Sequence, residues 1–581
     1  MSSDGTVDGA VEGGLDEPGH LEPVQGSLRL ASPEDAWTRA DWEKQAAAVL
    51  RKARRMSDED PDELVWEKLS RSTLDGIAVL PLGTASVLDD VRTTGRPTRS
   101  GDWDVRSLVD GRDARLAHEE AMADLDGGVT SLWLRVGADA DLETLLDGVL
   151  LDLAPVVLDA TDEPIAAARA FVAYVGDTDL ADGTNLGVDG EAAVDDLVAA
   201  AELARDAGTL AVVVDATRVH DRGASDVQEL AHSLAVGARV LRVLTEAGLS
   251  VDDAAALLEF RYAATDEQFP TIAKLRAARR LWDRVLELSG AGPARRQRQH
   301  VVTSRPMMSR YDPWVNMLRT TVAAFSAGVG GAAAVTVLPF DSPLGRPDAF
   351  GRRIARNTSH LLIDEAHVAH VADPAGGAYA VEKLTDDLAV AAWDLFGRLE
   401  DGADLDPEIE AVVARREAEI AKRKRPLTGL SEFPNLGEVL PERPPVDEPD
   451  VRRYGASFEA LRDDPAPSPV FLATMGTVAS HTARATFAAN LFAAGGVAVE
   501  VAGATNDPDE LAAAYAGQRV VCLAGADPTY TEWGQEAAQR LRQAGATHVV
   551  IAGKPTDYAD DSCAMGVDAL DFLTRTREHL R

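Results

Sequence analysis

A helix that ends in a glycine cluster and passes directly into an apolar run sets narrow limits on how this chain can fold. The segment YDPWVNMLRTTVAAFSAGVGG (residues 311–331) has the pattern of that helix, and three glycines within residues 328–331 close it. The apolar run Ala333–Leu338 follows at once and predicts a buried strand. An amphipathic helix over Ile272–Val285 precedes this pair, and another helix begins near Arg353. Helix–strand–helix order predicts an α/β fold, either a barrel or a doubly wound sheet.

The same alternation of apolar runs and helical patterns extends over residues 100–424, where it predicts a (β/α)8 barrel. One helix is well delimited, because Gly248 closes the pattern Asp226–Ala247. A polar loop around Trp103 is expected over Arg96–Asp110. The runs that predict strands are Ser131–Val136, Val156–Asp159, Thr209–Asp215, His300–Ser304 and Ala333–Leu338.

The segments before the barrel differ in composition from the rest. Residues 1–31 are rich in Gly, Asp and Glu and poor in aromatic residues, which predicts a flexible acidic arm. Residues 32–99 are expected to form a helical N-terminal region. Its first helix is predicted from Ser32 to about Arg55, because a serine cap followed by proline and two acidic residues suits a helix N-terminus. Leu74–Leu82 is expected to be a short strand or an extended segment.

The segments after the barrel predict a linker and a second, smaller domain. Asp406–Lys424 is expected to be a charged helix on the outside of the barrel. Residues 425–469 contain nine prolines, which predicts an extended linker. Residues 470–581 repeat the strand–helix pattern and predict a small doubly wound sheet. Its strands are expected at Val470–Thr474, Val497–Val501, Val520–Leu523 and His548–Ala552.

Composition excludes several classes of function. Acidic residues exceed basic residues by 96 − 58 = 38, which argues against nucleic acid or an anionic membrane as a partner. The two cysteines, Cys522 and Cys563, do not predict a disulfide framework, and they fit a reducing cytoplasm. The N-terminus shows no secretory signal, and no apolar run reaches the roughly 18–20 residues that span a bilayer.

The blocks Ile272–Val285, Tyr311–Phe340 and Arg353–Glu382 resemble methylmalonyl-CoA mutase, and more narrowly the small, non-catalytic subunit of the bacterial heterodimer. The resemblance runs from about Trp37 to the C-terminus. It implies an isomerase that interconverts succinyl-CoA and (R)-methylmalonyl-CoA with adenosylcobalamin. It also implies a larger catalytic subunit as partner, which binds the cofactor, while this chain has a supporting role. Residues 470–581 would then be a degenerate, flavodoxin-like domain of the cobalamin-binding type.

A mutase of this family threads its acyl-CoA along the barrel axis, which requires small polar side chains facing inward. The strands Leu210–Ala216 and Ala333–Phe340 do not meet this need in either register, because Val, Leu and Phe are prominent in them. A filled barrel is therefore expected.

The positions that match the family's catalytic residues have other side chains here. The family's catalytic histidine follows the first of these strands and falls on Arg218, with His220 two residues away. The family's catalytic tyrosine lies five residues before a tryptophan and falls on Thr98. No catalytic residue is therefore predicted in this chain.

Cobalamin binding in the family uses an Asp-x-His-x-x-Gly loop, whose histidine is the lower cobalt ligand, with a lysine shortly before it. Anchored on Met475 and Gly476, the lysine falls on Thr474 and the motif residues fall on Val478, Ser480 and Ala483. None of these four retains the required chemistry. His481 lies one place away and lacks the accompanying Asp and Gly. Neither a cofactor-binding residue nor a metal ligand is therefore predicted.

Two alternatives stay open at this point. The chain could be an active acyl-CoA mutase with relocated ligands, in which His220 and His481 serve. It could also be a binding module whose C-terminal domain holds a nucleotide, although the Gly495-Gly496 turn follows a helix and gives a dinucleotide fingerprint little support. A metal site near His360, His367 and His370 has no HExxH spacing, so a solvated or capping role is expected there.

Overall fold

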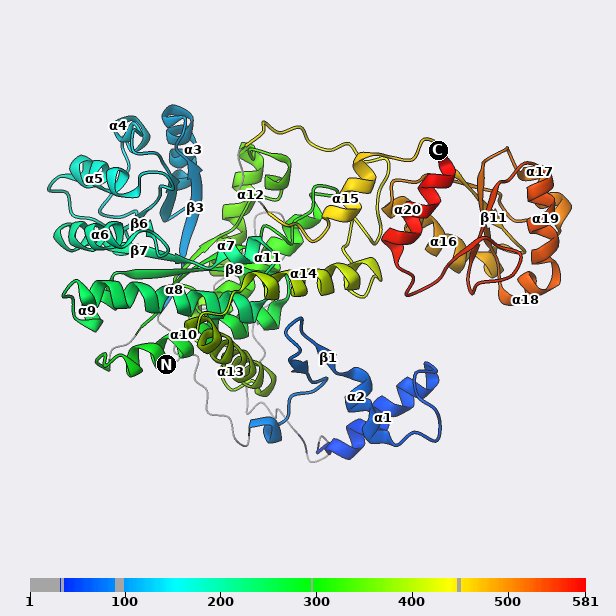
Figure 1. The fold of residues 1–581 in the computed structure, drawn as a ribbon, viewed down its shortest axis with the longest axis horizontal. Helices are drawn as coiled ribbons and strands as arrows, with labels where there is room; N and C mark the ends of the chain where they lie inside the picture. Colours follow the sequence, from blue (N-terminus) through cyan, green and yellow to red (C-terminus); the bar gives the residue numbers. More distant parts are fainter. Residues whose placement is uncertain (1–31, 33–35, 89–98, 294–295, 447–450) are drawn as a thin grey trace, which may run out of the picture. The chain divides into compact units, whose positions relative to one another are not determined.

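The computed structural model describes residue 32 and residues 36–88, 99–293, 296–446 and 451–581 (Figure 1). The chain divides into two compact units, Met1–Arg71 and Ser72–Arg581. The predicted acidic arm at residues 1–31 lies outside the described residues, and so does Thr98. None of the described helices combines the length and the apolar character needed to cross a membrane.

The first unit is built around helix α1 (Arg39–Lys52). Thr38 caps this helix reciprocally: its hydroxyl accepts from the Asp41 N–H, and the Asp41 carboxylate accepts from the Thr38 N–H. The 3-10 turn η2 (Asp62–Leu64) and helix α2 (Val65–Leu69) follow, and the rings of Trp42 and Trp66 lie 4.7 Å apart. The predicted helix start at Ser32 is wrong. The helix begins at Arg39, and its capping residue is Thr38, whose acidic partner is Asp41.

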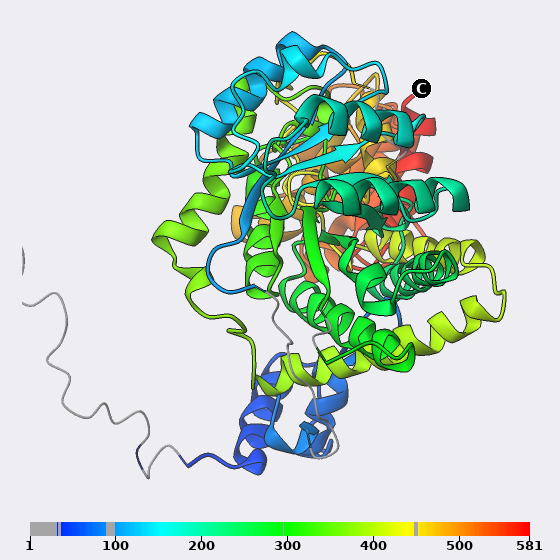
Figure 2. The same cartoon turned by 90° about the vertical axis from the view of Figure 1, so that its left-hand side faces the viewer.

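Eight parallel strands of the second unit close into a barrel, in the spatial order β10-β3-β4-β5-β6-β7-β8-β9. Helices follow the strands along the chain and cover the outside of the barrel (Figures 1 and 2), which fits a TIM barrel. The strands are β3 (Asp104–Asp110), β4 (Ser131–Arg135), β5 (Val156–Asp159), β6 (Asn185–Asp189), β7 (Leu210–Asp215), β8 (Leu258–Ala264), β9 (Arg298–Thr303) and β10 (Ala334–Thr336). The helices are α3 (Ala114–Asp126), α4 (Leu142–Leu145), α5 (Pro164–Val175), α6 (Val194–Ala207), α7 (Thr217–Asp221), α8 (Asp226–Glu246), α9 (Val251–Ala256), α10 (Gln268–Leu288), α11 (Val315–Val329) and α12 (Ala349–His360).

Strands β4, β5, β7, β9 and β10 match the predicted apolar runs to within two residues, whereas β3, β6 and β8 are missing from the prediction. The expected polar loop over Arg96–Asp110 is wrong from Asp104 onward, because these residues form β3. The physical reason is the same in all three strands. Polar or charged side chains such as Arg106, Asn185 and Glu259 are buried in them and interrupt the apolar pattern.

The segments after the barrel pack on its outside. Helix α13 (Tyr379–Glu400) contacts α8 and α10, and helix α14 (Asp406–Ala421) packs through Ile409 and Val413. The predicted linker is only partly extended, because it contains helix α15 (Ala456–Asp463). Polar contacts also hold the linker in place, for example Arg443 Nε, which donates to Asp341 Oδ2 at 2.5 Å.

A second sheet of five parallel strands follows, in the order β12-β11-β13-β14-β15. Numbered along the chain this is the order 2-1-3-4-5, which is consistent with a flavodoxin-like domain. Its strands are β11 (Val470–Thr474), β12 (Val499–Val501), β13 (Val520–Ala524), β14 (His548–Ala552) and β15 (Asp561–Cys563), and the last is absent from the prediction because it is short and polar. Its longer helices are α16 (Val478–Ala494), α17 (Pro508–Ala514), α19 (Gln535–Gln543) and α20 (Ala569–Leu580).

Asp75 lies between the short strands β1 (Arg71–Ser72) and β2 (Ala78–Val79) and contacts the N-terminus of α8. Burial raises the pKa of its carboxyl to about 6; the hydrogen bond donated by Ser225 Oγ opposes this shift, and repulsion from Asp226 adds to it. The ordinary value is 3.8, so protonation favours the folded state. The resulting stabilisation is fully present below pH ~4 and is lost as the pH rises through about 6.

We therefore expect Asp75→Asn to raise the free energy of unfolding at pH 7.5 by on the order of 1–3 kcal/mol, because the neutral amide removes a buried charge. At pH 4 the gain should vanish, because the aspartate is then largely protonated in the folded state. Urea unfolding curves at both pH values check this. A variant that is less stable than the parent at pH 7.5 would show that the ionised carboxylate is needed at this position.

Candidate functional site

Side chains from different walls of the barrel meet at its centre. Arg106 on β3 donates from Nη1 to Glu259 Oε1 on β8 at 2.8 Å and from Nε to Ser131 Oγ at 3.1 Å. Both side chains of the ion pair are fully buried. Strands β3 and β8 are not neighbours, so this pair crosses the interior. Burial by itself lowers the pKa of the Arg106 guanidinium, but Glu259 and Asp104 outweigh it and raise the pKa, so the arginine stays charged.

A second contact spans the full width of the barrel. The guanidinium carbon of Arg261 on β8 lies 4.0 Å from the ring centroid of Trp133 on β4, the opposite strand in the ring. Trp133 Nε1 donates to Asp159 Oδ2 at 3.2 Å, and Arg261 Nη1 donates to Asp215 Oδ2 at 2.8 Å. Burial tends to raise the pKa of Asp215, but the bonds from Arg261 and Thr217 lower it overall. A desolvated cation–π contact of this kind stabilises both walls.

His300 on β9 lies beside this contact as a neutral imidazole. Its Nδ1 accepts from Arg261 Nε at 3.1 Å, so Nε2 carries the proton and donates to Thr336 Oγ1 on β10 at 2.8 Å. Burial, and then repulsion from the nearby arginines, holds the pKa of His300 well below its ordinary range. The ring also meets Trp133 edge-on, with centroids 5.4 Å apart.

The barrel axis is therefore occupied by packed side chains. As predicted, side chains fill the barrel at these contacts, and several of them are charged or aromatic. The contacts of Asp215 and Thr336 identify the inward register of β7 and β10, so Val212 and Val214 face the surrounding helices. Charged and aromatic side chains from other strands fill the space instead.

Sequence reasoning missed this buried polar set, although one signal was available. Glu259 and Arg261 are two residues apart in the run LEFRYAA, where every residue of the strand is buried. Two opposite charges on one face of a buried strand require partners inside the fold, because an unpaired buried charge is costly.

Arg218 lies on α7 at the carboxyl-terminal mouth of the barrel. Its Nη2 is 2.6 Å from Asp189 Oδ2 at the end of β6. Both residues line a cavity of about 810 Å³, counted with the space open to solvent, whose other charged lining residues include Asp159, Glu191 and Asp215. Burial raises the pKa of Asp189. Arginine remains protonated, so Arg218 can hold a carboxylate but cannot shuttle a proton.

His220 points into the protein rather than toward this mouth. Its Nε2 lies 2.7 Å from Ser304 Oγ, and its Nδ1 lies 3.4 Å from Glu229 Oε2. Lys274 Nζ contacts the same carboxylate oxygen at 2.6 Å. The serine, histidine and glutamate side chains are 1%, 2% and 0% exposed. They are arranged like a catalytic triad, but a substrate cannot reach them. The cluster joins α7, α8, α10 and the end of β9. His220 is thus a residue of helix α7 that is bonded to buried neighbours.

The four positions predicted to correspond to the cobalamin loop lie on β11 and α16. The Thr474 hydroxyl, at the end of β11, donates to the carbonyl of Gly503. Val478 is the first residue of α16 and is exposed, and the Ser480 hydroxyl donates to a backbone carbonyl of the same turn at 2.7 Å. Ala483 lies in the second turn. The motif positions thus belong to a regular helix, not to a loop.

His481 is the histidine in this segment. It is buried in the first turn of α16, and its Nδ1 lies 3.2 Å from the carbonyl oxygen of Gly476. Elsewhere, His360 pairs with Asp364 at 3.2 Å, and the His367 and His370 rings stack with centroids 4.5 Å apart. Within the described ranges, no group of three or more His, Cys, Asp or Glu side chains is arranged to hold a metal ion.

Known proteins resemble this chain over nearly its whole length. A model of the methylmalonyl-CoA mutase family matches residues 207–489. The methylmalonyl-CoA mutase small subunit of Streptomyces virginiae is 44% identical over 613 aligned residues, which cover 95% of this chain and 98% of that protein. The chain belongs to the methylmalonyl-CoA mutase family. The small subunit of methylmalonyl-CoA mutase from Propionibacterium freudenreichii subsp. shermanii is 34% identical, with 95% and 96% covered.

Relatives named methylmalonyl-CoA mutase without the words small subunit match a shorter part of the chain. The protein from Cereibacter sphaeroides is 35% identical over 233 residues, which cover 38% of this chain and 33% of that protein. Methylmalonyl-CoA mutases are isomerases, and the family generally uses adenosylcobalamin. The residues of the α16 segment do not fit this cofactor, because its imidazole is buried against its own backbone and is not free to meet a cobalt ion.

Proposed function

We propose that this chain is the supporting small subunit of a heterodimeric, adenosylcobalamin-dependent methylmalonyl-CoA mutase and has no working active site of its own. The assembly interconverts succinyl-CoA and (R)-methylmalonyl-CoA. A larger catalytic subunit binds adenosylcobalamin and the thioester. The shared name of the relatives, small subunit, supports the existence of that larger partner. The two cysteines are free and buried, which fits a reducing cytoplasm.

The observation that carries this proposal is the occupied barrel axis. A thioester that runs along the axis needs the space taken by the Trp133–Arg261 contact and by the Arg106–Glu259 ion pair. Moving these side chains aside would leave buried charges without partners, at a cost of about 3–5 kcal/mol for each broken pair. Substrate binding would have to offset that cost before any chemistry.

The domain division proposed for this role follows the sequence boundaries. The proposed division assigns residues 1–31 to an acidic segment, residues 32–99 to an N-terminal region, residues 100–424 to the barrel and residues 425–469 to the linker. Residues 470–581 form a degenerate, flavodoxin-like domain of the cobalamin-binding type. The strand order of the C-terminal sheet supports this last assignment.

The test is a visible-spectrum titration of the purified chain with micromolar adenosylcobalamin. We expect the spectrum of the cofactor to be unchanged by this chain alone, and to change when the larger subunit is added. Isomerase activity should appear only with the larger subunit, and should fall when this chain is omitted. A spectral change with the isolated chain, or isomerase activity without the larger subunit, would instead support an active mutase with relocated ligands.

A further inference from the structure

The wall of the barrel is open between its first and last strands. Strand β3 pairs with β10 only at Asp104 and Val105, opposite Ala334 and Val335. Beyond this point β3 continues to Asp110 and pairs on its other side with β4, while β10 ends at Thr336. The carboxyl-terminal half of β3 therefore has a backbone edge that no strand covers.

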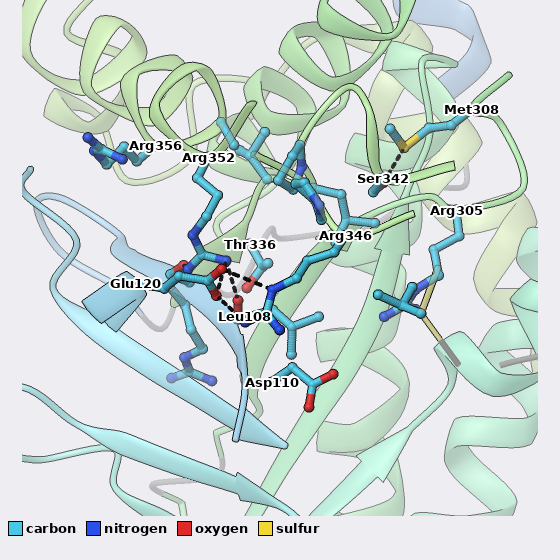
Figure 3. Close-up of a pocket in the computed structure, with 18 of the residues that line it drawn as sticks. Leu108, Asp110, Glu120, Arg305, Met308, Thr336, Ser342, Arg346, Arg352 and Arg356 are labelled. Atoms are coloured by element: carbon cyan, nitrogen blue, oxygen red, sulfur yellow. Dashed lines mark hydrogen bonds and ion pairs between the residues drawn. The ribbon is translucent and has the colours of Figure 1, made fainter. Parts of the chain in front are cut away.

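A cavity of about 1180 Å³, counted with the space open to solvent, lies at this opening (Figure 3). Its walls are β3, the segment after β10, helix α12 and part of the linker. Much of this volume is continuous with solvent, so the enclosed part suits only a small organic molecule. Apolar side chains form much of the lining, including Leu108, Met308, Leu338 and Ala355.

The charged lining of this cavity is mainly cationic, in contrast to the chain as a whole. Among the described residues, arginine supplies seven lining positions, whereas Asp110 and Glu120 are the two acidic ones. The chain carries a net charge of −38, so an anion is repelled by most of the molecular surface. Each of these arginines also pairs with a carboxylate, for example Arg352 and Arg356 with Asp124, so their charge is partly offset and attraction of an anion rests on guanidinium N–H groups that remain without a hydrogen bond to any described residue.

Two of these arginines retain unused hydrogen-bonding capacity. Arg352 donates to the exposed edge of β3 at the Leu108 carbonyl, 3.2 Å away, yet its Nε is buried and has no hydrogen-bond partner among the described residues. Arg346 Nε donates to Glu120 Oε1 at 3.1 Å. Its Nη2 lies 3.1 Å from Glu120 Oε2 but likewise makes no hydrogen bond within the described part of the chain. Figure 3 shows both guanidinium groups converging on Glu120 at the centre of the site.

We propose that this cavity binds an organic anion, with a carboxylate or phosphate head held by Arg346 and Arg352 and an apolar body packed against Leu338 and Met308. A guanidinium group suits either head group. Carboxylates and phosphates both have oxygen atoms that can accept two parallel N–H bonds from one guanidinium. The cavity adjoins the barrel interior, because Arg106 and Thr336 also line it, but the proposed contacts of Arg346 and Arg352 do not depend on the role proposed above for the chain.

Isothermal titration calorimetry of the full-length chain tests this site with phenylacetate and phenyl phosphate as probes. Acetate and inorganic phosphate lack the apolar body, and benzyl alcohol lacks the charge. We expect saturable heat with at least one of the two aromatic anions, and at least tenfold weaker binding of the other three compounds. The tighter aromatic anion identifies the preferred head group. Absence of saturable heat with both, or equal binding of benzyl alcohol, would overturn the proposal.

Two variants in the cavity and one control outside it test where the aromatic anion binds. Arg346→Gln should weaken the aromatic anion about tenfold or more, and Ser342→Glu, which adds a negative charge to the cavity wall, should do the same without removing an ion pair. The matched control is Arg284→Gln, because Arg284 is half-exposed on α10 and pairs with Glu287 outside the cavity. Circular dichroism establishes that each variant is folded. Unchanged affinity in both cavity variants, or an equal loss in the control, would rule out this site.

Discussion

The Glu259→Leu variant should lose about 3–5 kcal/mol of unfolding free energy, because the Arg106 guanidinium would then be a buried charge without its main partner. The two side chains are fully buried and 2.8 Å apart. Their ion pair joins β3 to β8 across the barrel, so the loss should appear in the cooperative unfolding of the barrel. Urea unfolding, followed by circular dichroism and by tryptophan fluorescence, measures it.

The double variant Arg106→Met, Glu259→Leu separates this charge effect from simple loss of packing. It should recover much of the stability, since two apolar side chains of similar volume leave no buried charge. The control is Glu287→Gln, which breaks a half-exposed pair with Arg284 and should change stability by less than about 1 kcal/mol. If Glu259→Leu is as mild as this control, the ion pair does not hold the barrel closed.

Lys274→Met should be comparably destabilising at neutral pH, because it leaves Glu229 ionised and buried. Lys274 Nζ lies 2.6 Å from Glu229 Oε2 and 2.9 Å from Asp226 Oδ1. Burial tends to raise the pKa of Glu229, but Lys274 and then His220 lower it overall. Its ion pair therefore stabilises the fold above the ordinary value of 4.5 and is lost as the pH falls through the lowered value. We expect a loss of about 3–5 kcal/mol at pH 7.

The pH dependence distinguishes this mechanism from a packing defect. Without Lys274 the Glu229 carboxyl should take up a proton more readily, so the difference between variant and parent should shrink as the pH falls below about 5. Arg280→Met on the same helix is the matched control, since its pair with Asp386 is partly exposed, and it should cost less than about 1 kcal/mol. A loss that is independent of pH would contradict the electrostatic explanation.

Local patterns predicted the apolar strands and the well-capped helices. Strands β5, β11 and β14 lie where the apolar runs predicted them, and α8 ends one residue before its predicted end. Strands β3, β6 and β8 escaped prediction because a rule based on apolar periodicity does not recognise a strand whose inward side chains are polar. The helix predicted from Ser32 begins later in the structure, where Thr38 makes the reciprocal capping bonds with Asp41.

The candidate site, too, could be predicted only in part from the sequence. The residues predict that Arg218, Val478, Ser480 and Ala483 stand at positions without the family's chemistry. Only the structure shows what surrounds these residues. Arg218 forms a salt bridge with Asp189, and the other three residues lie in the regular helix α16. The sequence did not predict the cavity beside β3, because its walls come from segments more than two hundred residues apart.

By itself the sequence determined the α/β class and the family, because both are carried by residue type and short-range order. The tertiary structure alone decided what occupies the barrel axis and where its wall opens. Arg106 and Glu259 are 153 residues apart, and nothing in the neighbourhood of either indicates the other. Burial makes such a pair energetically necessary, yet only the closed ring of strands determines which charges meet.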